Sequence, residues 1–132
     1  MNITQVAKLT QLSPKAIRFY EEKGLITAPS RASNGYRQYQ QQHIAELRLL
    51  HQARTVGFSL TEAKQLLQLY RNPKRRSAEV KQYTLQKIAD IEQQIQHLNQ
   101  MKDYLQQLAE QCPGNNDEYC PIIEGLACSS SP

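Results

Sequence analysis

The chain has 132 residues and a formal net charge of +4. This length allows one modest core, or one small domain with an extended element. No apolar run approaches the roughly 18 residues of a membrane span, and residues 1–6 lack the charged and apolar regions of a secretory signal. We therefore expect no membrane partner and a cytoplasmic location, where cysteine thiols stay reduced.

The charge is unevenly distributed along the chain. Residues 1–76 carry 5 Lys and 8 Arg against 4 Glu, a net charge of +9, whereas residues 77–132 carry 3 Lys against 8 Asp and Glu, a net charge of −5. A basic segment suits a polyanion, because phosphates attract Lys and Arg whatever the base sequence. The first part is therefore a candidate nucleic-acid-binding region, and a solvated basic face is the alternative.

Two short helices are predicted at the start of the chain. Apolar residues recur at helical spacing over residues 3–9. Ser13 and Pro14 are typical of an N-cap and a first helical position, and this second helix is expected to run to about Lys23. Two such helices joined by a tight turn form a helix-turn-helix, whose second helix enters the major groove of DNA. The pattern alone is weak, because many small helical proteins contain such a pair.

A small hairpin, or wing, is predicted after these helices. Asn34 and Gly35 form a strong turn signal. Short β-prone pieces over residues 25–27 and 36–39 flank this turn and are expected to pair. Such a wing beside a helix-turn-helix could lie along the DNA backbone.

Two further helices complete the predicted first domain, which covers residues 1–72. One is expected from about Gln41 to Arg54. The other is expected to begin at a capping box formed by Ser59 and Glu62, and to end at Asn72.

Residues 77–111 form one uninterrupted helical pattern without Gly or Pro. Apolar residues follow the alternating spacing of three and four that is typical of a coiled coil: Ile88, Ile91, Ile95, Leu98 and Leu105. Lys102 interrupts this stripe. A lone helix cannot bury the stripe on itself, so we expect a coiled coil between two copies of the chain. We expect its helices to be antiparallel, although the pattern alone does not determine their orientation. Packing of the stripe on the chain's own first domain is the alternative.

The remaining segment, residues 112–132, contains Cys112 and Cys120 in a loop. No histidine lies near them in the sequence, and a structural zinc site usually requires four Cys or His ligands. Two thiolates without further soft ligands suit a monovalent soft ion such as Cu(I). The sequence therefore predicts a metal site at Cys112 and Cys120.

Several segments resemble the MerR family of bacterial regulators, over the whole chain. The motifs are Ile3-x-x-Val6-Ala7, Ala16-Ile17-Arg18-Phe19-Tyr20-Glu21-Glu22-Lys23-Gly24-Leu25-Ile26, Asn34-Gly35-Tyr36-Arg37-x-Tyr39 and Gly57-Phe58-Ser59-Leu60-x-Glu62. The cysteine loop, with Cys112-Pro113-Gly114 and Cys120-Pro121-Ile122-Ile123-Glu124, is similar to that of the copper-efflux branch of this family.

The resemblance implies a mainly helical, homodimeric transcription activator that binds double-stranded promoter DNA and acts on RNA polymerase at the promoter. In the copper-efflux branch, Cu(I), Ag(I) or Au(I) binds between the two loop cysteines, and metal binding distorts the DNA so that the promoter elements realign. Ser77 stands where divalent-sensing relatives carry a third cysteine, although its position also fits a helix N-cap. Lys81 would approach the metal site from the partner subunit, or is an exposed helix charge.

The resemblance also implies a set of DNA-binding residues. Arg18 could read a guanine edge, while Lys15 and Tyr20 could contact phosphates. The remaining expected contacts are Arg31, Tyr36, Arg37 and Tyr39 in the wing and Arg54 at the end of the third predicted helix. For each residue ordinary solvation is the alternative, and for Tyr20 and Tyr39 it is core packing.

Other functions remain open at this point. Cys128 could join Cys112 and Cys120 in a Zn(II) site, with Asp117 or water as a fourth ligand. A copper chaperone or buffer would need only the cysteine loop, and a redox-sensing member of the same family would use the cysteines without metal. His97 is expected to be solvated. Because no phosphate loop and no nucleophile with a nearby base is evident, we expect no enzyme.

Overall fold

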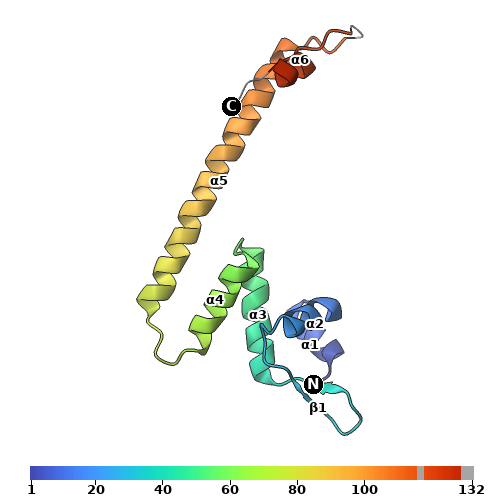
Figure 1. Cartoon of the computed structure of the whole chain (residues 1–132), viewed down its shortest axis with the longest axis vertical. Helices are drawn as coiled ribbons and strands as arrows, with labels where there is room; N and C mark the ends of the chain where they lie inside the picture. The colour runs from blue at the N-terminus through green and yellow to red at the C-terminus, as the bar shows by residue number, and fades with distance from the viewer. Residues whose placement is uncertain (116–117, 129–132) are drawn as a thin grey trace. The chain divides into compact units, whose positions relative to one another are not determined.

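The computed structural model describes residues 1–115 and 118–128, and it is mainly helical as expected. The described helices are α1 (Ile3–Thr10), α2 (Pro14–Glu22), α3 (Gln41–Thr55), α4 (Leu60–Arg71), α5 (Ser77–Gln111) and α6 (Pro121–Cys128), and the strands are β1 (Ser30–Arg31) and β2 (Arg37–Gln38) (Figure 1). The chain divides into two compact units, Met1–Lys81 and Gln82–Pro132. Among the described residues no helix has the length and apolar character needed to cross a bilayer.

The core of the first unit lies where α1, α2, α3 and α4 meet. Val6 of α1, Ile17 of α2 and Leu47 of α3 are completely buried, and the helices contact one another in the pairs α1–α2, α1–α3 and α3–α4. Burial of such side chains removes apolar surface from water, which is the main favourable contribution to folding. The contact between α1 and α2 holds α2, the predicted DNA-reading helix, against α1.

Side-chain caps define where these helices begin. The Ser13 side chain accepts a hydrogen bond from the Ala16 N–H at 3.0 Å, and Pro14 occupies the first helical position. Ser59 and Glu62 form the predicted capping box at the start of α4. Each cap satisfies an N–H group that has no partner within the helix. The helix starts expected from these residues are therefore confirmed.

The wing is a short antiparallel hairpin in which Ser30 pairs with Gln38 and Arg31 with Arg37. The prediction of a strand over residues 25–27 is wrong. Leu25 and Ile26 are 4% and 3% exposed, so two successive side chains are buried in the core. Successive side chains of a strand point to opposite faces, so a strand at the edge of this small domain could not bury both.

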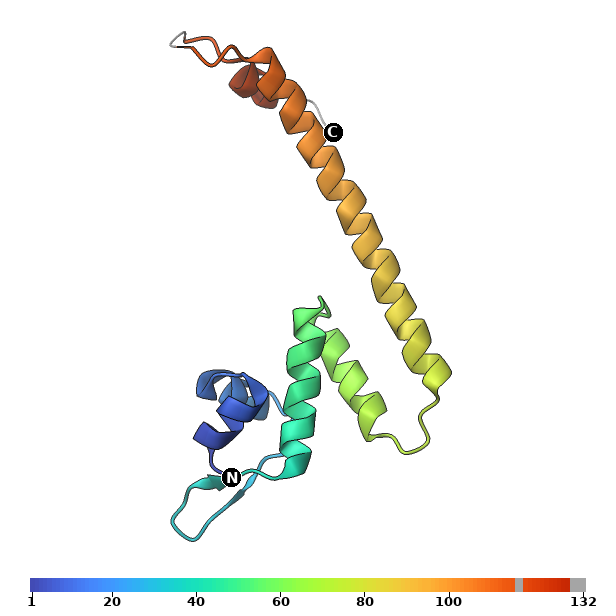
Figure 2. The ribbon, with the colours of Figure 1, turned by 180° about the vertical axis from the view of Figure 1, so that it is seen from behind.

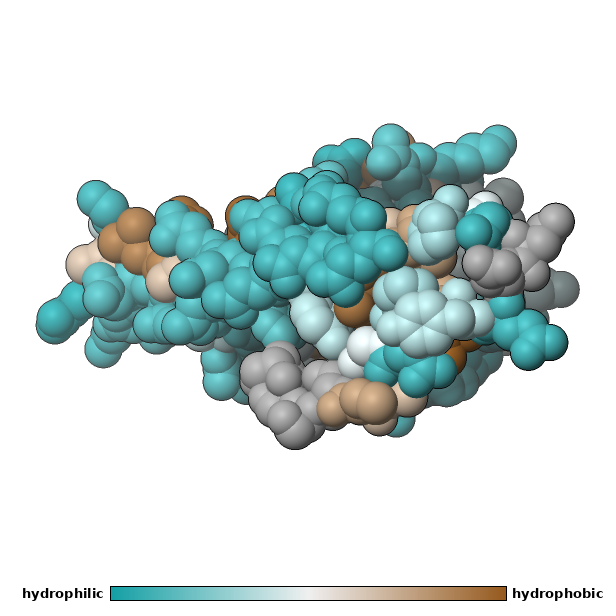
Figure 3. Space-filling view, turned by 90° about the horizontal axis from the view of Figure 1, so that it is seen from above, coloured by the Kyte–Doolittle hydropathy of each residue, from teal (hydrophilic) through white to brown (hydrophobic). Residues whose placement is uncertain are grey.

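In the second unit, α5 carries its apolar residues largely exposed. Ile88, Ile95 and Leu98 are 45%, 53% and 59% exposed. Hydrophobic side chains also reach the surface between hydrophilic ones in the space-filling view (Figure 3). The stripe predicted for a coiled coil is thus unburied within a single chain. After the cysteine loop, the eight residues Pro121–Cys128 form the short helix α6.

Candidate DNA-binding face and metal site

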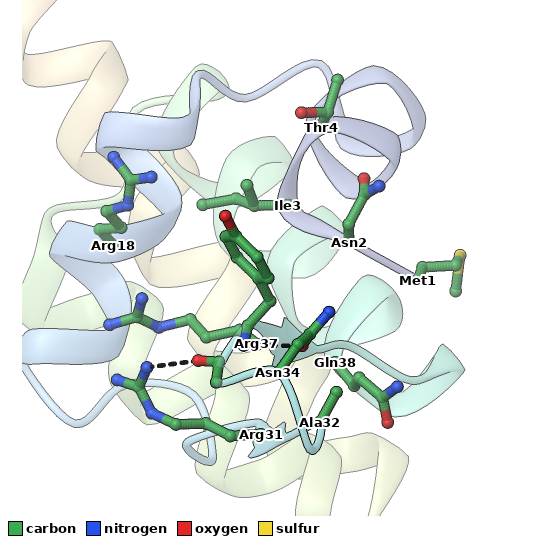
Figure 4. Close-up of a pocket in the computed structure, with 12 residues that line it drawn as sticks. Met1, Asn2, Ile3, Thr4, Arg18, Arg31, Ala32, Asn34, Arg37 and Gln38 are labelled. Carbon is green, nitrogen blue, oxygen red and sulfur yellow. Dashed lines mark hydrogen bonds between the residues drawn. The ribbon is translucent and has the colours of Figure 1, made fainter.

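A cleft opens between the start of α1, the outer face of α2 and the wing. Arg18 comes from α2, Arg31 from β1 and Arg37 from β2, and their guanidinium groups gather along one side of the cleft (Figure 4). Three cations on one face attract the phosphates of nucleic acid. The structure therefore brings together the arginines that the sequence placed in two separate segments.

The tip of the wing is held by local hydrogen bonds. Arg31 Nη1 donates to the Gly35 carbonyl at 2.9 Å, a bond that is dashed in Figure 4, and Asn34 Oδ1 accepts from the Tyr36 N–H at 3.1 Å. Gly35 has φ +86°, a conformation that side-chain-bearing residues adopt with strain. Tyr36 is 73% exposed at this tip. Its ring is thus presented to solvent on a fixed turn.

Glu21 connects the wing to α2. Its Oε1 accepts a hydrogen bond from Arg37 Nε at 2.9 Å, and its Oε2 accepts one from the Tyr39 hydroxyl at 3.2 Å. The hydrogen bond to Glu21, followed by the charge of Glu21, raises the pKa of Arg37. Burial, followed by the charge of Glu21, raises the pKa of Tyr39 to about 12. Arg37 and Tyr39 are therefore both hydrogen-bonded to Glu21 of α2, the predicted DNA-reading helix.

Two tyrosines of the expected DNA-binding set lie in the core. Tyr20 is 8% exposed and Tyr39 is 2% exposed, and the Tyr39 ring packs edge-on against His43 at a centroid distance of 5.8 Å. Tyr39 also pairs with Met1, since the Tyr39 N–H donates to the Met1 carbonyl at 2.8 Å. This burial favours core packing, the alternative considered for both residues, over phosphate contacts from their rings. The other expected contacts, Lys15, Arg18, Arg31, Tyr36 and Arg54, are exposed.

A second ion pair connects the end of α4 to α3, and no local pattern of residues predicts it. Arg71 donates to both carboxylate oxygens of Glu46, at 3.0 Å and 2.8 Å, and to the Leu25 carbonyl at 2.9 Å. Glu46 is 1% exposed. Burial raises its pKa, but hydrogen bonds from Arg71 and Gln42 outweigh this, so the pKa is lowered overall. Arg71 thus connects α4 with α3 and with the segment between α2 and the wing.

In the second unit, the two loop cysteines lie side by side. The distance from Cys112 Sγ to Cys120 Sγ is 3.9 Å, and both are free thiols that are partly buried. A disulfide would require about 2.05 Å. With metal–sulfur bonds of about 2.3 Å, as in zinc thiolates, two sulfurs bridged by one ion lie at most about 4.6 Å apart. The pair is therefore within the range of a single bridging ion.

Cys120 is held at the start of α6. Its carbonyl accepts from the Glu124 N–H at 3.0 Å, so Cys120 takes the N-cap place before Pro121. Hydrogen bonds from the N–H groups of Ile123 and Ile122 lower the pKa of the Cys120 thiol, with a further contribution from Cys112. Burial and the charge of Glu124 act in the opposite direction. The N–H groups at the start of α6 are thus placed to stabilise a thiolate at Cys120.

The donor set suits a soft ion of low coordination number. Within residues 1–115 and 118–128, no three His, Cys, Asp or Glu side chains come together as a metal-binding group. Cys128 is exposed at the end of α6 and does not join the pair. Asp117, the other ligand considered for Zn(II), lies outside the described residues. Two thiols without a third such ligand fit Cu(I) better than a structural zinc ion.

Comparison with known proteins decides the family. Residues 1–70 match the model of the MerR HTH family regulatory protein, and residues 44–108 match the MerR DNA-binding model. The chain belongs to the MerR family.

Similar proteins of the MerR family cover nearly the whole chain. The HTH-type transcriptional regulator CueR of Yersinia pestis is 59% identical over 99% of this chain and 96% of its own length. CueR of Escherichia coli O6:H1 is 57% identical over 96% of this chain and 94% of its own length. The structure of PbrR691 from Ralstonia metallidurans CH34, in complex with lead(II), matches with a TM-score of 0.83 and 27% identity, covering 96% and 98% of the two chains. The chain is accordingly a DNA-binding transcription regulator and not an enzyme.

The start of α5 carries the remaining residues that the MerR resemblance singled out. Ser77 and Lys81 line a shallow groove together with Pro73, Arg75 and Val80. The Arg76 carbonyl accepts from the N–H groups of Glu79 and Val80, at 3.0 Å and 3.4 Å. Ser77 is therefore the first helical residue, and the expectation that it is the N-cap is corrected. Ser77 and Lys81, four residues apart on α5, line the same groove.

Proposed function

We propose that this MerR family member is a homodimeric activator of copper-efflux or detoxification genes that responds to Cu(I), with Ag(I) and Au(I) as alternative effectors. The observation that carries the proposal is the pair of thiols at Cys112 and Cys120, 3.9 Å apart, with no third His, Cys, Asp or Glu beside them among the described residues. The names of the similar CueR proteins also support copper as the effector.

The proposal assigns a task to each part of the chain. Residues 1–72 bind promoter DNA, residues 77–111 form an antiparallel coiled coil with a second copy, and residues 112–132 bind the metal. Support for the coiled coil comes from the exposed Ile and Leu side chains of α5, which a single chain leaves in water. A regulator of this kind acts with the chromosome in the cytoplasm.

DNA binding is assigned to exposed residues, of which Arg18, Arg31 and Tyr36 line the cleft and Lys15 and Arg54 lie outside it. Arg18 on α2 is placed to read a base edge in the major groove, with Lys15 one turn earlier on a phosphate. Arg31 and Tyr36 extend this contact along the backbone from the wing, and Arg54 adds a phosphate contact from the end of α3. Arg37 contributes mainly by fixing the wing through Glu21, 2.9 Å away.

In the metal site, Cys112 and Cys120 would hold the ion as thiolates. One monovalent cation and two thiolates leave a net charge of −1, which is costly to bury without compensation. The N–H groups at the start of α6 supply part of that compensation at Cys120. Lys81 of the partner subunit would supply a positive charge, and Ser77 of the partner subunit would close the site without adding a soft ligand.

The response follows from a shift between two DNA-bound conformations of the dimer. A ligand shifts such an equilibrium only by its difference in affinity for the two states. The conformation favoured by metal would bend and untwist the DNA, so that promoter elements with an overlong spacer align for RNA polymerase. The deformation energy is offset by protein–DNA contacts that the bent state permits.

The test is anaerobic transcription in vitro from an overlong-spacer promoter, with Cu(I), Ag(I) and Zn(II) each held at buffered free concentrations. Activation by Cu(I) and Ag(I) but not by Zn(II) is expected. Activation by Zn(II) would contradict the two-thiolate site and bring Cys128 into it. Activation by a thiol oxidant without metal would indicate a redox sensor, and copper binding without promoter binding would indicate a chaperone or buffer.

A further inference from the structure

The short helix α6 packs back onto the last turns of α5 in both ribbon views (Figures 1 and 2). The Tyr104 hydroxyl donates a hydrogen bond to the Gly125 carbonyl at 3.3 Å. Leu108 is the buried residue of α5, with 6% of its surface exposed, whereas Leu105, one turn earlier, is 52% exposed. The side chains of Tyr104 and Leu108 therefore form a seat for α6.

Gly125 allows α6 to approach this seat closely. A Cβ atom at position 125 would overlap Leu108 Cδ2 and lie 3.7 Å and 3.8 Å from Leu108 Cγ and Cδ1. The backbone conformation at Gly125 is not one that requires glycine, since its φ is not positive. Glycine is unfavourable inside a helix, so its presence here is explained by the space against Leu108.

The contact of α6 with Tyr104 and Leu108 affects the distance between the two thiols. Cys112 follows the end of α5, and its N–H donates to the Ala109 carbonyl at 3.2 Å. Cys120 is fixed to the start of α6 by the Glu124 N–H. One sulfur thus moves with α5 and the other with α6. Among the described residues, the contact between the two helices is what holds the sulfurs 3.9 Å apart.

We propose that Tyr104, Leu108 and Gly125 are positioning residues for the Cys112–Cys120 pair, through the docking of α6 on α5. The inference rests on the proposed metal-binding function, but it makes a claim about the thiols that can be measured without metal. Residues that orient metal ligands without touching the metal are a common determinant of metal affinity.

The experiment uses the full chain with Cys128→Ser as the common background, so that only one thiol pair remains. The metal-free protein is equilibrated with reduced and oxidised glutathione. Each oxidised glutathione that forms the Cys112–Cys120 disulfide releases two reduced glutathione molecules. The equilibrium constant reports the effective concentration of one thiol at the other. Cu(I) affinity is measured separately, by competition with a colorimetric Cu(I) chelator.

Leu108→Ala is expected to lower the Cu(I) affinity about tenfold, the lower end of the range for residues that orient ligands, and to lower the disulfide equilibrium constant as well. Tyr104→Phe, which removes the hydroxyl, and Gly125→Ala should lower both by smaller factors. The control is Met101→Ala. Met101 lies seven residues before Leu108, at the equivalent position of the heptad, and is 48% exposed; this variant should leave both quantities unchanged.

A double variant tests whether the contact itself is responsible. In Gly125→Ala/Leu108→Ala the added methyl group enters space vacated by Leu108, so its effect should be smaller than the product of the two single effects. Circular dichroism is used to check that each variant retains its helix content, and sedimentation to check that it retains dimerisation. This separates displacement of α6 from general unfolding.

Unchanged disulfide equilibria in Leu108→Ala and Gly125→Ala, with helix content retained, would overturn the inference. A background protein that binds no Cu(I), but whose disulfide equilibrium still falls in Leu108→Ala, would refute the proposed function while leaving the positioning role intact. Loss of Cu(I) affinity without any change in the disulfide equilibrium would place Leu108 in another role and contradict the inference.

Discussion

Glu21 and Arg37 face each other between α2 and β2, with 2.9 Å between Oε1 and Nε. Their side chains are 14% and 33% exposed, respectively. The carboxylate neutralises an arginine on the very face where cations gather, and it links the wing to the reading helix. Arg31, across the hairpin from Arg37, donates instead to a backbone carbonyl and has no anionic partner in the described hydrogen bonds.

The two wing arginines should therefore differ in what their removal does to DNA binding. Arg31→Ala is expected to reduce the slope of log affinity against log salt by about one, as for a lost phosphate contact. Arg37→Ala should change that slope less and should lower thermal stability, because it leaves Glu21 without its cation. Fluorescence anisotropy of labelled promoter DNA across a salt series measures the first effect, and thermal unfolding the second. Equal slopes for the two variants would show that Arg37 contacts a phosphate after all.

The Glu46–Arg71 pair should make the stability of the first unit depend on pH. The folded pKa of Glu46 lies below its ordinary value, so the unfolded chain binds more protons in the acidic range. The contribution of the pair is then complete above the ordinary carboxyl pKa and is lost as the pH falls through the folded pKa.

Glu46→Gln tests this directly. At pH 7 it should lower the free energy of unfolding by about 2 kcal/mol, less than the 3–5 kcal/mol of a fully buried pair, because the Arg71 side chain is 37% exposed. The difference from the unchanged protein should shrink towards pH 3 in urea unfolding. Glu110→Gln, at an exposed position of α5, serves as the control. A difference that stays constant with pH would mean that the charge of Glu46 is not what stabilises the fold.

The exposed stripe of α5 predicts how the dimer can be broken. Ile95→Asp places a charge in the predicted seam, where it would be buried without a partner, and should convert the dimer to monomer at micromolar concentration in sedimentation equilibrium. Gln93→Asp introduces the same charge on the outer face and should leave the dimer intact. A monomeric protein before any substitution would contradict the coiled coil.

Ser77 predicts the selectivity of the metal response. Ser77→Cys would add a third sulfur near the proposed site, and three sulfurs with a water suit a divalent ion better than two do. We expect Zn(II) to activate transcription in this variant and not in the unchanged protein. Ser77→Ala should keep the Cu(I) response, because the hydroxyl is not a ligand. If Zn(II) does not activate transcription in Ser77→Cys while Cu(I) still does, position 77 lies away from the metal.

Local signals in the sequence were sufficient to predict where the helices of the first unit lie. Ser13, Ser59 and Glu62 mark helix starts through bonds to residues three positions away, and such caps can be recognised in sequence. The wing strand near residue 25 was misplaced because apolar β-prone residues occur both in strands and in buried connections. Only the packed structure distinguishes these two cases.

The candidate sites were predicted unevenly, for a similar reason. Cys112 and Cys120 could be paired because only seven residues lie between them and no histidine is near them in the sequence. Tyr39 was expected on the DNA face but is buried. The sequence of a basic loop does not indicate whether a tyrosine ring points to solvent or into the core. The partnerships of Glu21 with Arg37 and of Glu46 with Arg71 span 16 and 25 residues. Pairs of this kind depend on how the helices are packed, which no local pattern specifies.

The N-cap position of Cys120 gives the protein two built-in spectroscopic reporters. The amide protons of Ile122 and Ile123 point at the same sulfur that would hold the ion. Any change in the electron density on that sulfur alters the hydrogen bonds and hence the magnetic environment of these two protons. Nitrogen–proton correlation spectra of selectively isoleucine-labelled protein would therefore follow occupancy of the loop at two known resonances, without any label attached to the cysteines themselves.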